Sequence, residues 1–316
     1  MNTFYFIVNP KAGNGKGRAV WKRAEQKLNT LHIPYRAFFT EYPGHAIELS
    51  RTAAGLADGE QAVVVAVGGD GTAHEVLNGL GAFATSGFGF IPAGSGNDFS
   101  RGFGIPADPM DALGLLLGIQ ERNPSSTDCG SLNLNGKNHL FINSAGAGFD
   151  ALVSKKANES RLKGLFNRLS LGKLVYVYIL LKELASYNRT PLQVTIDGNV
   201  HSFKDAWFAT VSNQPYYGGG MIISPCARPD DGELDITVVH RLSKAKLLLV
   251  FMSVFWGKHT SFEEVHMFKG KEIKIQTTSP IHIHADGEYI GMANTGEIMA
   301  VPGAAKLAHG TPGKET

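Results

Sequence analysis

The stretch AVVVAVGGDGTAHEVLNGL, residues 62–80, decides the fold. Small β-branched residues, typical of a strand buried on both faces, stop at Gly68 and Gly69, and a helix-like pattern follows Gly71 at once. One carboxylate, Asp70, lies among these glycines. A carboxylate beside phosphate-binding backbone is repulsive unless a cation or a proton-transfer task accounts for it. We therefore expect Asp70 to face Mg²⁺ bound to nucleotide phosphates, with a solvated turn aspartate as the alternative.

The rest of the first 128 residues repeats this strand–helix unit. Further strands are expected at 4–10, 34–40 and 87–93, and further helices at 17–31, 44–57 and 109–119. Strands that alternate with helices of about 10–15 residues pair in parallel and form a layered α/β domain.

The second half has a different rhythm. Apolar and polar residues alternate at 131–149, 192–203, 206–214, 233–240, 271–278 and 281–291, and several of these segments break at Asp-Gly or Asn-Gly pairs. That pattern predicts an antiparallel sheet arranged as a β-sandwich. Two helical stretches interrupt it, near 160–186 and 243–257.

The bulk composition argues against some classes. A formal net charge of +2 over 316 residues gives no reason to expect a nucleic acid partner. Cys129 and Cys226 have neither metal-ligand spacing nor a disulfide framework, which favours a reducing, cytoplasmic setting. The start, MNTFYFIVNP, predicts a strand rather than a signal peptide. The longest apolar run, 247–256, is shorter than the about 20 residues that a membrane-spanning helix needs.

Three glycine-rich segments follow strands of the first half: NPKAGNGKG (9–17), GGDGT (68–72) and AGSGNDF (93–99). Ligands gather at the carboxyl ends of parallel strands, so we expect one shared site. Glycine lets backbone N–H groups approach phosphate oxygens, although each segment alone could be only a tight turn. Neither the Walker A pattern nor the G-x-G-x-x-G fingerprint is matched, which argues against a standard nicotinamide dehydrogenase.

Eight segments follow one another along the chain: IVNPKAG, TEYPGHA, VVAVGGDGTAHEVLNGL, FGFIPAGSGNDFSRGFGIP, NSAGAGFDA, SNQPYYGGGMIISPCARPDDGELDI, GKH and HADGE. In order and spacing they resemble the diacylglycerol kinase catalytic-domain family, and most closely its soluble bacterial lipid kinases. NAD kinases and phosphofructokinases share only the GGDG-type loop. The resemblance implies an ATP-binding α/β lobe at 1–128, onto which residues 297–316 pack back. It also implies a lipid-binding β-sandwich lobe at 129–296 and an active site between the lobes.

The resemblance assigns roles to particular residues. The nucleotide would lie on Asn9, Pro10, Lys11, Ala12, Gly13, Thr40, Gly68, Gly69, Asp70, Gly71, Thr72, Ala73, His74, Ser95 and Asn97. Asp231, with the backbone carbonyls of Arg228 and Glu233, matches a structural magnesium site of bacterial members. His74 and the GSGNDF segment depart from the commonest family pattern, which leaves the nucleotide preference open.

Phosphoryl transfer to an alcohol needs positioning, charge neutralisation and a proton acceptor. Asp286 matches the position of the family's catalytic base and is the preferred candidate, followed by Glu288 and Asp70. The Asp-Gly pair that begins with Asp286 could also be a plain hairpin turn. His282 and His284 alternate along one strand face, and we expect half-exposed strand residues there rather than metal ligands.

Residues 151–173 combine basic and apolar side chains, as an interfacial membrane contact requires. Against the single acid Glu159, this segment carries Lys155, Lys156, Arg161, Lys163, Arg168 and Lys173, interleaved with Leu162, Leu165, Phe166, Leu169 and Leu171. A solvated charged face is the alternative. The apolar runs 174–181 and 247–256 could line a lipid cleft or serve as core helices.

The leading hypothesis is an ATP- and Mg²⁺-dependent lipid kinase that phosphorylates the hydroxyl of a membrane lipid, either diacylglycerol or a related lipid alcohol. It would work in the cytoplasm, peripherally at the inner membrane surface. One alternative is a non-catalytic or regulatory protein that binds lipid or nucleotide. Another is a soluble-metabolite kinase of the NAD kinase type. The identity of the lipid and the oligomeric state are left open, with a homodimer as one alternative.

Overall fold

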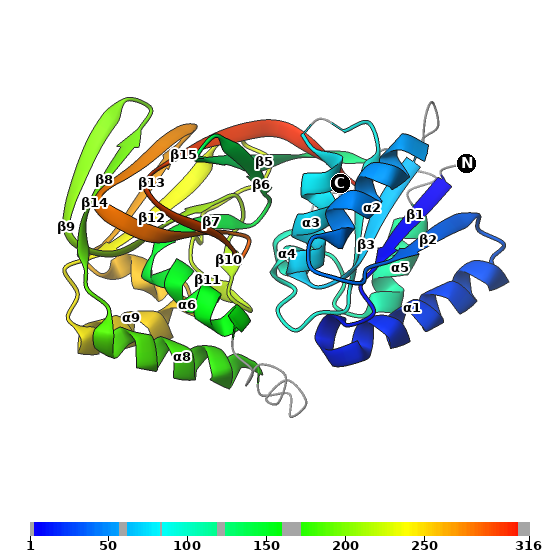
Figure 1. The fold of residues 1–316 in the computed structure, drawn as a ribbon, viewed down its shortest axis with the longest axis horizontal. Helices are drawn as coiled ribbons and strands as arrows, with labels where there is room; N and C mark the ends of the chain where they lie inside the picture. Colours follow the sequence, from blue (N-terminus) through cyan, green and yellow to red (C-terminus); the bar gives the residue numbers. More distant parts are fainter. Residues whose placement is uncertain (1–2, 57–61, 83, 119–123, 160–171, 309–316) are drawn as a thin grey trace. The chain divides into compact units, whose positions relative to one another are not determined.

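The computed structural model describes residues 3–56, 62–82, 84–118, 124–159 and 172–308. The chain divides into two compact units (Figure 1). The N-terminal unit consists of Met1–Thr127 together with Gly303–Thr316, and the C-terminal unit of Asp128–Pro302. The end of the chain thus belongs to the N-terminal unit.

The N-terminal unit is built on a parallel sheet with the strand order β4-β3-β1-β2. Its strands are β1 (Thr3–Val8), β2 (Tyr35–Phe39), β3 (Ala62–Gly68) and β4 (Gly87–Pro92). Its helices are α1 (Ala12–Thr30), α2 (His45–Leu56), α3 (Asp70–Leu80), α4 (Asp98–Gly102) and α5 (Pro109–Leu117). The last strand of the chain, β15 (Glu288–Leu307), places Leu307 in parallel beside Phe88 of β4.

Helices cover both faces of this sheet. Trp21 of α1 packs on Phe6 of β1 with ring centroids 5.1 Å apart, and Leu113 of α5 joins the same apolar cluster. Helices α2 and α3 pack together along the sheet (Figure 1). Every residue of β3 and β4 is buried, because these central strands are covered on both sides. Because the four strands are parallel, all four carboxyl ends meet at one edge of the sheet.

The C-terminal unit is built on antiparallel pairs, in the order β13-β12-β9-β7-β14-β15, with β8 pairing both β9 and β14. Its strands are β5 (Ser125–Leu134), β6 (Lys137–Phe141), β7 (Ser144–Gly148), β8 (Thr190–Ile196), β9 (Asn199–Ser212), β10 (Tyr216–Tyr217), β11 (Met221–Ile222), β12 (Leu234–His240), β13 (Val265–Gly270) and β14 (Glu272–Ala285), with most of β15. Its helices are α6 (Phe149–Glu159), α8 (Gly172–Ser186), α9 (Lys244–Val254) and the 3₁₀ helix η2 (Lys258–Ser261).

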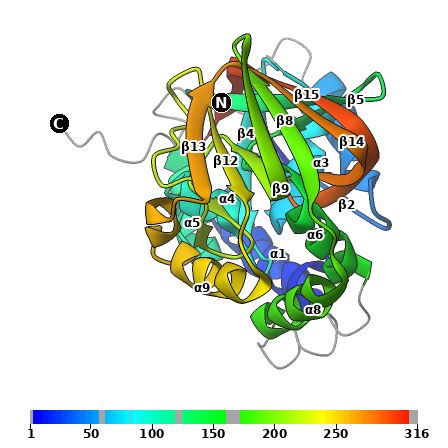
Figure 2. The same cartoon turned by 90° about the vertical axis from the view of Figure 1, so that its left-hand side faces the viewer.

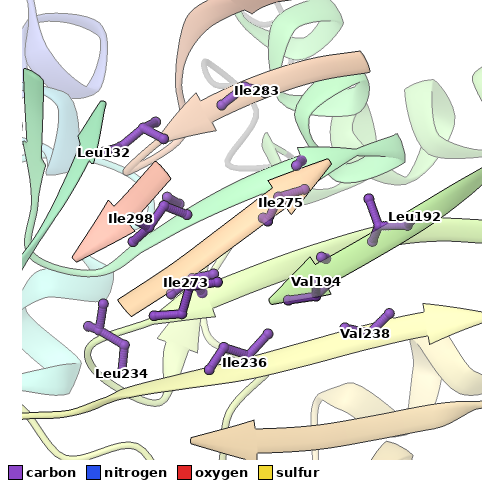
Figure 3. Close-up of a cluster of buried hydrophobic side chains, with 14 of the residues drawn as sticks. Leu132, Leu192, Val194, Leu234, Ile236, Val238, Ile273, Ile275, Ile283 and Ile298 are labelled. Carbon is purple, nitrogen blue, oxygen red and sulfur yellow. The ribbon is translucent and has the colours of Figure 1, made fainter. Parts of the chain in front are cut away.

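Two apolar cores stabilise the C-terminal unit. The first lies among the strands, where aliphatic side chains from β5, β8, β12, β14 and β15 converge (Figure 3). The second lies between the sheet and the helices α6, α8 and α9 (Figure 2). Trp207 of β9 is its largest member, and its indole N–H donates to the backbone carbonyl of Leu242 at 2.9 Å. The helices are thereby fixed to one face of the sheet.

The sheet types agree with the sequence pattern: parallel in the first half and antiparallel in the second. Several boundaries differ. The expected strand 131–149 is divided into β5, β6 and β7, and α6 starts at Phe149, before the expected helical stretch. Of that stretch, residues 160–171 lie outside the described residues, and α8 accounts for the rest. The short α4 and the half-buried β13 were not predicted, because neither shows a periodic apolar pattern.

Strands β12 and β13 bring two imidazoles together, with His240 Nε2 2.9 Å from His266 Nε2. Burial, reinforced by His266, lowers the pKa of His240. A histidine whose pKa is lower in the folded state stabilises the fold above its unfolded pKa of about 6.5, and this stabilisation is lost as the pH falls. We expect the Tm of His240→Gln to fall less than that of the wild type between about pH 7 and about pH 5. The exposed control His32→Asn should follow the wild type, and equal slopes for all three proteins would contradict this expectation.

Candidate functional site

The three glycine segments lie at the carboxyl ends of β1, β3 and β4 and contact one another. A Cβ atom on Gly13 would lie 2.4 Å from the carbonyl oxygen of Ala93. A Cβ atom on Gly94 would lie 2.5 Å from the Cα of Gly69. Backbone passes so close to backbone at these two crossings that only glycine fits. The segments therefore form a single surface of exposed backbone.

The first segment makes an unusual turn before the regular part of α1. Gly13, Asn14 and Gly15 have φ angles of 55°, 60° and 94°, so three consecutive residues are left-handed. Asparagine tolerates this region better than most residues with a Cβ. Successive N–H groups in such a turn point into a common concavity, which is an arrangement that binds anions. This turn can hold phosphate oxygens.

Asp70 is the first residue of α3, and its carboxylate is fixed by the third glycine segment. The backbone N–H of Phe99 donates to Asp70 Oδ1 at 2.9 Å. A helix N-terminus favours negative charge, which stabilises the carboxylate there. Carboxylate oxygen is a ligand type that Mg²⁺ prefers, usually together with substrate phosphates. Asp70 therefore fits a magnesium ion that arrives with a nucleotide.

The other candidates for nucleotide binding lie in or beside the same segments. Asn9 donates through Nδ2 to Thr72 Oγ1 at 3.2 Å, which links the first two segments. Thr40 follows β2, and its N–H donates to the carbonyl of Val8 at 2.9 Å. In the third segment, Asn97 has a left-handed backbone, and its Oδ1 is buried without a hydrogen-bond partner in the described part of the chain. The remaining nucleotide candidates also lie there: Pro10, Lys11, Ala12, Gly68, Gly71 and Ser95 are within these segments, and Ala73 and His74 follow the second segment directly in α3.

Glu75 has a positioning role that the sequence reasoning missed. Its two carboxylate oxygens accept the N–H groups of Gly44 and Ala46 at 2.9 and 3.1 Å. These donors lie at the start of α2, so Glu75 of α3 caps the helix that packs beside it. The cap thereby fixes the TEYPGHA segment, which begins at Thr40. The available signal in the sequence was the acid Glu75, which lies on the predicted helix directly after GGDGT.

In the C-terminal unit, Asp286 lies in the hairpin turn between β14 and β15 and is almost fully buried. Its φ of 50° and the φ of 81° at Gly287 are those of a two-residue turn with both residues left-handed. Its Oδ1 accepts the N–H groups of Asn143 and Ser144 at 2.8 and 3.1 Å, and its Oδ2 accepts that of Ile142 at 3.1 Å. This carboxylate thus pins the turn to the segment before β7.

The buried side chains of His284 and Asp150 also support this turn. His284 Nδ1 accepts the N–H of Gly287 at 3.2 Å, so the ring proton is on Nε2. That proton points to Asp150 Oδ2 at 3.3 Å, and Thr210 Oγ1 donates to the same oxygen at 3.1 Å. The expectation that His284 is half-exposed is wrong, because α6 covers this face of β14. His282 is partly buried and contacts the hydroxyl of Tyr289 at 3.2 Å.

Glu288 is the first residue of β15 and follows this turn directly. Its side chain is exposed, and its carboxylate makes no hydrogen bond or ion pair with the residues that the structure describes. A general base needs an oxygen lone pair that is open to the substrate hydroxyl. The geometry of Glu288 meets this requirement more simply than that of Asp286, whose oxygens accept three backbone N–H groups.

The predicted structural metal site is arranged around a lysine. Lys269 Nζ lies 2.5 Å from Asp231 Oδ2 and 3.6 Å from Glu233 Oε2. Arg228 instead pairs with Asp230, Nε to Oδ1, at 3.3 Å. Among the described residues no group of three or more His, Cys, Asp or Glu side chains is placed to hold a metal ion. The ammonium group of Lys269 already neutralises the carboxylate of Asp231. Magnesium at Asp231 stays a prediction.

Burial changes the pKa of an aspartate beside this lysine. Asp235 on β12 is paired in register with Lys269 on β13. Burial raises the pKa of Asp235 to about 6, although Lys269 acts in the opposite direction. The carboxylates at Asp231 and Glu233 raise it further. Lys269 is thus the charge that three neighbouring acids share.

An apolar cavity that is open to solvent lies in the second core of the C-terminal unit, and its empty space is about 490 Å³ when the solvent at its mouth is included. Its walls are almost entirely apolar and come from α6, α8, α9 and the sheet. The lining residues that carry polar side-chain groups are Asp150, Tyr217 and His259. Burial lowers the pKa of His259, and the neutral ring donates from Nε2 to the carbonyl of Ile223 at 2.9 Å. Such a lining favours an apolar group over a polar one.

The predicted basic membrane segment is described only in part. Lys155 Nζ lies 4.5 Å from the ring centroid of Tyr289, and Lys156 Nζ lies 3.9 Å from Glu159 Oε2. The other four basic residues lie outside those whose side chains the structure describes. Throughout the described ranges, each helix is too short or too polar to cross a bilayer.

The two units correspond to two domains of one class of enzyme, the lipid kinases. Residues 3–131 match the diacylglycerol kinase catalytic domain. Residues 143–309 match the YegS C-terminal NAD kinase beta sandwich-like domain. The chain belongs to this family of diacylglycerol kinase-type lipid kinases. The predicted fold class and the predicted enzyme class are thereby confirmed.

Known relatives span nearly the same length. The Bacillus subtilis (strain 168) protein named "Putative lipid kinase YtlR" is 38% identical over 294 residues, which is 92% of this chain and 94% of that protein. A diacylglycerol kinase of Mycobacterium tuberculosis (strain ATCC 25618 / H37Rv) is 34% identical over 257 residues, 81% of this chain and 79% of that one. A crystal structure of a diacylglycerol kinase from Bacillus anthracis str. Sterne has the same fold, with a TM-score of 0.70 and 22% identity, and the match covers 98% of this chain and 97% of that chain.

Proposed function

We propose that this lipid kinase transfers the γ-phosphoryl group of Mg²⁺-bound ATP to the hydroxyl of a diacylglycerol-type membrane lipid. The proposal is carried by the position of Asp150. This residue lines the apolar cavity, and it also contacts His284, which accepts a hydrogen bond from the turn before Glu288. One carboxylate thus joins a site for an apolar chain to a site for a proton acceptor. The names of the diacylglycerol kinase relatives support the same acceptor class.

In the N-terminal unit, the backbone of the three glycine segments holds the phosphates, and Asp70 holds the magnesium ion. Magnesium neutralises charge on the transferring phosphoryl group. Asn97 Oδ1, which is buried without a partner among the described residues, accepts a hydrogen bond from the nucleotide. The glycines at the backbone crossings keep this surface free of side chains.

In the C-terminal unit, Glu288 takes the proton of the lipid hydroxyl. The hydroxyl oxygen forms a bond to the γ-phosphorus, the bond from the γ-phosphorus to the bridging oxygen breaks, and ADP leaves. Asp286 positions Glu288 by holding the turn through three backbone N–H groups. Asp286 as the base itself stays the alternative. The enzyme acts peripherally at a membrane surface, where its lipid substrate resides.

The cavity holds one acyl chain of the lipid. Val250 of α9 lies on its wall and is buried. We expect Val250→Phe to fill part of the cavity and to raise the KM for a long-chain diacylglycerol about tenfold, with the KM for ATP unchanged. The measurement is labelled phosphoryl transfer to diacylglycerols of increasing chain length, with the Tm as a check on folding.

The matched control is Val200→Phe, at an exposed position in the same unit. It should leave the dependence on chain length as in the wild type. A Val250→Phe enzyme that treats every chain length like the wild type would place the chain elsewhere.

A further inference from the structure

Helix α9 carries an apolar face toward solvent. Leu249, Met252 and Trp256 are three and four residues apart, so they project from one side of the helix and of the turn that follows it. We call these three residues the α9 stripe. Leu249 and Trp256, 68% and 66% exposed, are the two most exposed large apolar side chains in the described part of the chain.

The opposite side of α9 is also apolar, because it lines the cavity. Leu247, Val250, Phe251 and Val254 all belong to the cavity wall. A surface helix of a globular protein normally turns a polar face to water, and α9 has none of this kind at its centre. Contiguous exposed apolar surface marks an interaction site. The α9 stripe is therefore a candidate interaction surface.

Helix α8 also carries exposed apolar side chains. Tyr178 and Leu181 are exposed on α8 and lie three residues apart. The two helices lie close together (Figures 1 and 2), and Lys244 Nζ of α9 donates to the carbonyl of Ala185 of α8 at 2.5 Å. Both helices also line the cavity, through Leu180 and Leu247. The exposed apolar residues of α8 and α9 thus lie on the outer side of the cavity wall.

The charge around this surface is positive. Segments 178–189 and 241–258 contain one acid, Glu183, and the basic residues Lys182, Arg189, Arg241, Lys244, Lys246 and Lys258, of which Lys246 is paired with Glu264 of the following segment. Lys182 follows Leu181 directly, and Lys258 lies two residues after Trp256. Neither of these two lysines makes an ion pair with the described residues. Lysine beside an exposed tryptophan and aliphatic residues is the composition of a helix that lies in the interface of an anionic membrane.

We propose that the α9 stripe, with Tyr178 and Leu181, docks on the surface of an anionic lipid bilayer, and that an acyl chain enters the cavity beside α9. The proposal rests on the proposed function, because that function assigns the chain to the cavity. A second copy of the chain is the alternative occupant. Trp256 would lie at the headgroup level, where its ring and its N–H are both accommodated.

Tryptophan fluorescence tests the docking directly. The chain has three tryptophans, and Trp21 and Trp207 are buried, so Trp256 is the exposed one. We expect vesicles of phosphatidylcholine with phosphatidylglycerol to shift the emission to shorter wavelength, and added salt to weaken the shift. Trp256→Phe should abolish the shift. An emission spectrum that vesicles leave unchanged would overturn the proposal.

Vesicle cosedimentation of the double variant Leu249→Gln/Trp256→Gln gives an independent measurement. We expect its partition coefficient to fall by about tenfold or more, because two large apolar side chains no longer enter the interface. The control Val200→Gln removes an exposed apolar side chain elsewhere in the same unit and should bind like the wild type. A double variant that sediments like the wild type, or one that changes only the oligomeric state, would overturn the proposal. Binding is measured without ATP, so an absence of phosphoryl transfer would leave this result standing.

Discussion

Replacing Asp70 with asparagine is expected to lower kcat for lipid phosphorylation by about 10²- to 10³-fold, the size of effect that follows loss of one preorganised electrostatic contact. The amide oxygen of asparagine can still accept the N–H of Phe99, so the connection between α3 and α4 is kept. The substitution removes the negative charge to which we assign the magnesium ion. The measurement is the initial rate of labelled phosphoryl transfer from ATP, with the Tm confirming an intact fold.

A matched control is Asp111→Asn, which removes an exposed aspartate from α5 of the same unit. It should retain the wild-type rate. Raising the magnesium concentration should recover part of the rate lost in Asp70→Asn and none in the control. A fully active Asp70→Asn enzyme would show that this aspartate only shapes its turn.

The substitution Glu288→Gln is expected to lower kcat by about 10²- to 10⁴-fold, which is the usual contribution of a general base. The Tm should stay unchanged, because the carboxylate of Glu288 is exposed and makes no hydrogen bond with the described residues. Rates are measured with a diacylglycerol acceptor in mixed micelles.

Asp286→Asn should behave differently from Glu288→Gln. An asparagine has one acceptor oxygen, so at least one of the N–H groups of Ile142, Asn143 and Ser144 loses its partner. A buried unpaired N–H costs about 1–3 kcal/mol, so we expect a lower Tm as well as lower activity. An active Glu288→Gln enzyme beside an inactive Asp286→Asn enzyme of normal Tm would make Asp286 the base.

Much of the N-terminal unit could be predicted because its signals are local. The run of small apolar residues at 62–68 predicts a buried strand by itself. Parallel pairing then brings the carboxyl ends of β1, β3 and β4 together. The glycines could be placed at the site for the same reason. Their contact with one another could not, because it depends on backbone crossings between segments that are far apart in the sequence.

The C-terminal unit shows where the sequence alone was insufficient. The alternation of His282 and His284 predicts a shared strand face, but not that α6 covers His284 with Asp150, which lies 134 residues away in sequence. The partner of Asp231 was equally hidden, because Lys269 lies on β13, a strand with no clear pattern. Long-range pairing decides both cases, and periodicity carries no information about it.

A lipid kinase transfers the γ-phosphoryl group of ATP to a lipid hydroxyl. The most direct measurement is transfer of labelled γ-phosphoryl from ATP, with Mg²⁺, to a panel of acceptors presented in mixed micelles. The panel contains diacylglycerol, phosphatidylglycerol, a sphingoid base and an isoprenoid alcohol, with NAD as the water-soluble comparison. We expect diacylglycerol to be labelled and NAD to remain unlabelled. Label in NAD without detergent, or in none of the lipids, would contradict the account.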